Sequence, residues 1–71
     1  MITIRNTKGR FLRDYKKETK MLAIQKALFY CDYDFRKSYK DGVVFIKQAD
    51  VHDFVIYLDS FMKELNNSNK N

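Results

Sequence analysis

Few side chains in this 71-residue sequence could take part in catalysis. Cys31 is the single cysteine and His52 the single histidine, which excludes an intrachain disulfide and a zinc site built from several Cys and His ligands. The other candidates are Ser38, Ser60 and several aspartates, but catalysis requires such groups to converge. Cys31 falls on the apolar stripe of one predicted helix and His52 on the polar flank of another. We therefore expect a non-catalytic protein with no metal, no cofactor and no small-molecule substrate.

Positive charge is the second feature with chemical meaning. The formal net charge is +5 at pH 7, and residues 1–40 hold eleven basic and four acidic residues, whereas residues 41–71 hold three basic and five acidic ones. A basic patch attracts polyanions, although a solvated lysine-rich surface is the alternative interpretation. Seven basic residues fall within sixteen positions, namely Arg5, Lys8, Arg10, Arg13, Lys16, Lys17 and Lys20.

Six short elements are predicted to position these groups. The alternation that starts at Ile2 predicts a strand, and residues 11–15 predict its returning partner in a hairpin. From about residue 18 the apolar spacing becomes that of a helix, which we expect to end before Asp32. Thr19 is the candidate N-cap of this helix.

The second half of the sequence repeats this order. Residues 33–39 alternate and lead through Asp41-Gly42 into residues 43–47, and Asp-Gly between two β-prone runs predicts a hairpin with a type I′ turn. That turn makes Lys40 oppose Val43, Tyr39 oppose Val44 and Lys37 oppose Ile46.

The last helix is the clearest element. Asp50 is its expected N-cap, and apolar residues from Val51 to Leu65 follow a 3-4 spacing for four turns. The polar residues 66–71 are expected to form a disordered tail. The order ββαββα predicts one α+β domain over residues 1–65, with a four-stranded antiparallel sheet and two helices.

Strand alternation gives the basic residues a candidate surface. Core packing of Ile2, Ile4 and Leu12 turns basic and aromatic side chains to the other face of the sheet. Such a face binds single-stranded nucleic acid, since rings stack on bases and cations contact phosphates. The alternative is that Phe11 and Tyr15 point into the core, or that a helix covers this face. The predicted binding residues for RNA or DNA are Arg5, Lys8, Arg10, Phe11, Arg13, Tyr15, Lys16, Lys17, Lys20, Arg36, Lys40, Phe45 and Lys47.

A second surface supports a different class of function. Ile56 lies opposite the apolar stripe of the last helix, and Tyr57 lies at its border. These side chains are candidates for a contact with a host protein or with a second copy of the chain. The alternative to nucleic-acid binding is therefore a modulator or inhibitor of a host enzyme.

Composition suggests a biological setting. Phe, Tyr, Met, Ile, Asn and Lys make up 34 of the 71 residues, whereas Gly, Ala, Arg and Pro make up 9, as expected of an AT-rich gene. In this respect the chain resembles the small accessory proteins of AT-rich phages and mobile elements. With no export signal and no apolar run long enough for a membrane span, we expect it in the cytoplasm, that of a bacterial host if the gene is phage-borne.

Overall fold

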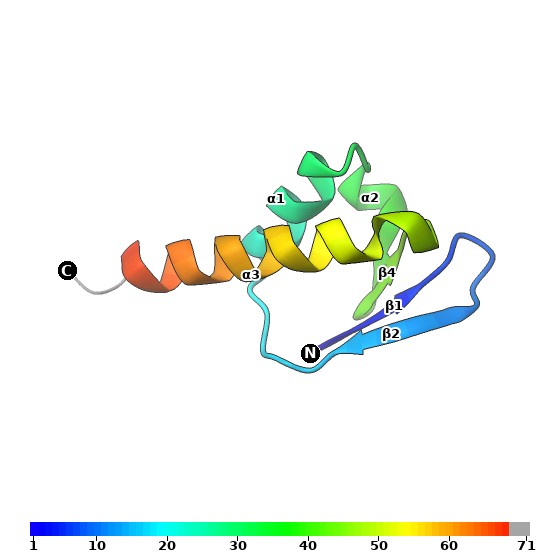
Figure 1. The fold of residues 1–71 in the computed structure, drawn as a ribbon, viewed down its shortest axis with the longest axis horizontal. Helices are drawn as coiled ribbons and strands as arrows, with labels where there is room; N and C mark the ends of the chain where they lie inside the picture. The colour runs from blue at the N-terminus through cyan, green and yellow to red at the C-terminus, as the bar shows by residue number, and fades with distance from the viewer. Residues whose placement is uncertain (69–71) are drawn as a thin grey trace.

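Two hairpins and a layer of helices make up the chain, which a computed structural model describes over residues 1–68 (Figure 1). The hairpins follow the expected order, but an additional short helix precedes the second one. In chain order the elements are β1 (Ile2–Arg5), β2 (Phe11–Tyr15), α1 (Met21–Tyr30), α2 (Phe35–Ser38), β3 (Tyr39–Lys40), β4 (Val43–Phe45), a 3-10 turn (Gln48–Asp50) and α3 (Val51–Ser68).

The four strands form one mixed sheet in the order β2-β1-β4-β3. Both hairpins are antiparallel, but β1 runs parallel to β4, with Ile4 opposite Val44. The prediction of an entirely antiparallel sheet is therefore wrong. The two strands with fully buried residues lie side by side at the centre. Because α1 and α2 carry the chain to the far edge of the sheet, β4 returns beside β1 in the same direction.

The turn at Asp41-Gly42 is confirmed. Asp41 has φ 50° and Gly42 has φ 81°, as a two-residue type I′ turn requires. The pairs Tyr39–Val44 and Lys40–Val43 match the predicted register.

Residues 35–38 form a helical turn instead of the predicted strand, so Lys37 does not pair with Ile46. The carboxylate of Asp34 accepts the backbone N–H of Arg36 at 3.0 Å and caps this turn. Ser38 becomes buried, and the Phe35 ring stacks on Tyr39 with the centroids 5.2 Å apart. A short run with alternating apolar residues fits either structure, and the local cap favours the helix here.

The predicted N-cap of α1 is wrong, and Asp50 directly precedes α3 as predicted but its carboxylate has another partner. The N-cap of α1 is Lys20, which makes no side-chain capping bond, and not Thr19. Asp50 ends a 3-10 turn that leads directly into α3. Its carboxylate instead accepts the hydroxyl of Tyr33 at 2.5 Å. This hydroxyl also accepts the backbone N–H of Lys47 at 2.9 Å, which ties the loop after β4 to the segment after α1.

Helices α1 and α3 pack against each other and against one face of the sheet (Figure 1). The apolar stripe of α3 is confirmed as its core side, and the helix continues to Ser68, beyond the expected end at Leu65. The rest of the predicted tail, residues 69–71, lies outside the described residues.

No helix within residues 1–68 is long and apolar enough to cross a membrane. The core consists of Ile2, Ile4, Tyr15, Ala23, Ile24, Ala27, Leu28, Val44, Ile46, Val51, Phe54 and Leu58.

Candidate functional site

The sheet face that points away from the helices carries two phenyl rings on either side of an arginine. Arg5 in β1 pairs with Phe11 in β2 and with Phe45 in β4. Cross-strand partners share a face and neighbouring strands lie about 4.8 Å apart, so the two Phe backbones are about 10 Å apart with Arg5 between them. Phe11 is 51% exposed, and Arg5 and Phe45 are half-buried. By strand pairing, this open face comprises Thr3, Arg5, Phe11, Asp14, Lys40, Val43 and Phe45.

The turn of the first hairpin adds cations at the Arg5 end of this face. The Arg5 guanidinium donates one hydrogen bond through Nη1 to the Gly9 carbonyl at 2.9 Å, which leaves further N–H donors for a ligand. The side-chain oxygen of Asn6 accepts the backbone N–H groups of Lys8 at 2.9 Å and Arg10 at 2.8 Å. The backbone of the turn is therefore held in place, while the Lys8 and Arg10 side chains are exposed.

A β-bulge decides which face each residue of β2 occupies. Ile4 pairs with Arg13 and Arg5 with Phe11, so Leu12 is an extra residue between two pairs. Leu12 packs on the core, as expected, but the bulge shifts the alternation by one residue after it. Arg13 therefore lies on the helix-covered side at the exposed sheet edge, and the prediction that it faces outward from the open face is wrong.

Tyr15 belongs to the core and not to the open face, because the same bulge turns it inward opposite Ile2. Its hydroxyl donates a hydrogen bond to the carboxylate of Asp59 in α3. Burial raises the pKa of Tyr15 above its usual range, and the hydrogen bond to Asp59 raises it further. The residue thus joins β2 to α3 as a neutral phenol.

Replacing Tyr15 with phenylalanine is expected to cost about 1 kcal/mol of folding free energy at neutral pH, because one partly buried hydrogen bond is lost. Since the folded-state pKa lies above the unfolded value near 10, the contribution is complete below pH 10 and is lost as the pH rises beyond it. Urea denaturation between pH 7 and pH 11 should therefore show a flatter alkaline decline for Tyr15→Phe than for the wild type. Tyr57→Phe is the control, and equal alkaline slopes for Tyr15→Phe and the wild type would contradict the role of this phenol.

The remaining predicted binding residues are spread over other parts of the surface. Lys16, Lys17 and Lys20 are exposed in the segment between β2 and α1, where the Lys17 ammonium lies 3.5 Å from the Asp59 carboxylate. Arg36 is exposed on α2, in the helical layer. Lys47 is exposed in the loop after β4. Of the thirteen predicted residues, the structure brings together six, which are Arg5, Lys8, Arg10, Phe11, Lys40 and Phe45.

The candidates for a protein contact also separate. Ile56 is exposed on α3. The Tyr57 side chain is half-buried, and the centroid of its ring lies 5.5 Å from the centroid of the Tyr30 ring in α1. A larger exposed apolar surface, absent from the sequence-based predictions, lies on α1 around Leu22 and Phe29. The signal for it was the unusual width of the apolar pattern between residues 21 and 31.

Cys31 and His52 have different surroundings. The Cys31 thiol packs partly against the core, and burial together with the nearby Asp50 carboxylate raises its pKa, which disfavours the nucleophilic thiolate. His52 is exposed in the first turn of α3. Within residues 1–68, His, Cys, Asp and Glu side chains form no group of three that could hold a metal ion.

Comparisons with known proteins identified no relative of this chain. No protein-family profile matches the sequence, and neither the curated proteins nor the solved structures contain a match to the chain.

Proposed function

We propose that this protein binds single-stranded nucleic acid on the open face of its sheet, with RNA as the preferred ligand and without catalysis. The observation that carries the proposal is the row Phe11–Arg5–Phe45 across three adjacent strands. Two phenyl rings offer stacking platforms for bases, and the guanidinium between them offers hydrogen bonds and charge to a phosphate.

Charge around the row supports this ligand class. Lys8 and Arg10 lie in the adjoining turn and form no ion pair with any residue that the structure describes. Lys40 lies on the far edge of the open face, on the strand next to Phe45. Asp14 is the acidic member of the face and lies on the opposite edge strand, in the neighbouring row. A strand of nucleic acid that follows the row Phe11–Arg5–Phe45 therefore meets Lys8 and Arg10 at the Phe11 end, whereas Lys40 lies in the neighbouring row, at the opposite end from Asp14.

The first test is a titration of fluorescent single-stranded RNA and DNA oligonucleotides followed by anisotropy at several salt concentrations. Each neutralised phosphate of a single strand contributes about −0.7 to the slope of log K against log salt. The double variant Lys8→Glu/Arg10→Glu is therefore expected to make this slope shallower by about 1.4 and to weaken binding at about 50 mM salt. Circular dichroism checks that the fold is unchanged.

The matched control carries the same change of charge on the helical side. Lys37→Glu/Lys63→Glu alters two exposed lysines in α2 and α3 and should leave the slope close to that of the wild type. If both double variants lose affinity equally, binding depends on net charge and not on the open face. Absence of binding at low salt contradicts the proposal and favours the alternative, a protein that modulates a host enzyme through protein–protein contacts.

A further inference from the structure

Helix α1 is apolar on both of its sides. Its inner side buries Ala23, Ile24, Ala27 and Leu28 against the sheet and α3. Helices that are apolar all round are normally covered all round, and Lys26 is the only charged residue of α1. On the outer side, large apolar groups are exposed, with Phe29 at 74% and Leu22 at 48%, next to Tyr30 and Met21.

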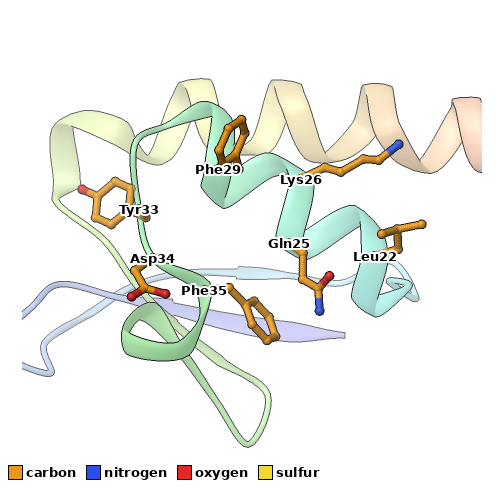
Figure 2. Close-up of a pocket in the computed structure, with 7 residues that line it drawn as sticks. All are labelled: Leu22, Gln25, Lys26, Phe29, Tyr33, Asp34 and Phe35. Atoms are coloured by element: carbon orange, nitrogen blue, oxygen red, sulfur yellow. The ribbon is translucent and has the colours of Figure 1, made fainter.

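This outer side borders a groove between α1 and the segment that follows it. Leu22, Gln25 and Phe29 form one stripe because they are three and four residues apart. Figure 2 shows them emerging from α1, with Phe35 of α2 across the groove. The groove holds a solvent-open pocket of about 370 Å³, whose lining is mainly apolar by area and also includes Lys26 and Asp34. The stripe of Leu22, Gln25 and Phe29 with this groove is called the α1 face below.

We infer that the α1 face binds the α1 face of a second copy of the chain, with the two α1 helices antiparallel across a two-fold axis near Gln25. In this arrangement Leu22 of one copy lies beside Phe29 of the other at both ends of the stripe. Such a contact is self-complementary, as a two-fold interface has to be. A polar residue close to the axis of an apolar seam also fixes the register of the two helices.

The charges at the ends of α1 identify a second copy as the occupant. Lys20 directly precedes the helix, and Asp32 and Asp34 follow its end. Antiparallel pairing places the basic start of each helix near the acidic end of the other, whereas a uniformly acidic or basic partner is repelled at one end. Lys26 does not obstruct the contact, because its ammonium group lies 5.6 Å from the centroid of the Phe61 ring in α3.

The size of the exposed apolar surface of α1 indicates a weak dimer. Full burial of an aromatic side chain removes about 150–250 Å² from water, so the exposed parts of Phe29 and Leu22, together with those of the flanking Tyr30 and Met21, offer on the order of 400 Å². This area is about half of the 800 Å² per partner that is typical of stable complexes. We therefore expect a monomer–dimer equilibrium in the micromolar range. The open faces lie on the far side of each sheet and stay free, so the dimer does not depend on the proposed function.

Sedimentation velocity over a concentration series tests the inference. The wild-type mass is expected to rise from monomer to dimer between low micromolar and submillimolar concentration. Phe29→Glu and Leu22→Glu should each weaken the dimer by at least about tenfold, because a charge is buried without a partner. If a glutamate variant fails to fold, the milder Phe29→Ala takes its place in this test, because it truncates a side chain that is largely exposed. Phe11→Glu and Ile56→Glu place the same charge on half-exposed apolar positions elsewhere and should leave the dimer intact.

Cross-linking tests the antiparallel orientation. Gln25→Cys lies near the two-fold axis and should form a disulfide-linked dimer under mild oxidation, whereas Ser60→Cys, exposed on α3, should not. A wild-type chain that remains monomeric at submillimolar concentration overturns the inference. So does a dimer that is insensitive to both Phe29→Glu and Leu22→Glu, or one in which Gln25→Cys and Ser60→Cys cross-link equally.

Discussion

Replacing Phe11 and Phe45 together with alanine is expected to weaken binding of single-stranded RNA by about 30-fold or more. Each base stacked on an aromatic ring contributes about 1–3 kcal/mol, so two lost platforms cost at least about 2 kcal/mol. The fold should tolerate the change, because Phe11 is half exposed and Phe45 is only half buried on the open face. Anisotropy titrations at constant salt measure the effect, and the salt slope should change little because no cation is removed.

The matched control is Phe29→Ala, which removes a more exposed ring from α1 on the other side of the molecule. It should leave RNA affinity unchanged while it weakens the dimer. Single variants refine the result, since Phe11→Ala and Phe45→Ala should each lose part of the affinity if both rings stack on bases. An unchanged affinity in the double variant would show that nucleic acid, if it binds, uses charge elsewhere on the surface.

The largest expected effect on stability comes from Phe54→Ala. Phe54 is fully buried in the first half of α3 and belongs to the core cluster formed by the helices and the sheet. Truncation of a buried phenylalanine costs about 3–5 kcal/mol, because contacts are lost and a cavity remains. Domains of this size are stable by roughly 4–11 kcal/mol, at about 0.05–0.15 kcal/mol per residue. The variant should therefore lose between about a quarter and all of the free energy of unfolding.

Urea denaturation followed by circular dichroism measures this loss. Ile56→Ala, on the exposed side of the same helix, should change the free energy of unfolding by less than about 0.5 kcal/mol and is the control. A cost below about 1 kcal/mol for Phe54→Ala would contradict the position of α3 in the core.

Local signals in the sequence determined the turns and the longer helices. Asp41-Gly42 supplies the positive φ angles of a type I′ turn, so the second hairpin and its register near the turn follow from two residues. The apolar residues of α3 repeat at helical spacing, and no other period places them all on one side. The basic character of residues 1–40 and the aromatic content are likewise properties of the sequence alone.

Tertiary structure decided the pairing of β1 with β4 and the faces of the side chains. No local sequence signal determines that β4 runs parallel to β1. The direction of β4 depends on the path that the chain takes across the sheet through α1 and α2. The bulge at Leu12 arises only when β2 pairs with β1, and it moves Tyr15 into the core and leaves Phe11 outside. The open face therefore keeps two of the three predicted rings, because strand alternation is reliable only until an extra residue shifts it.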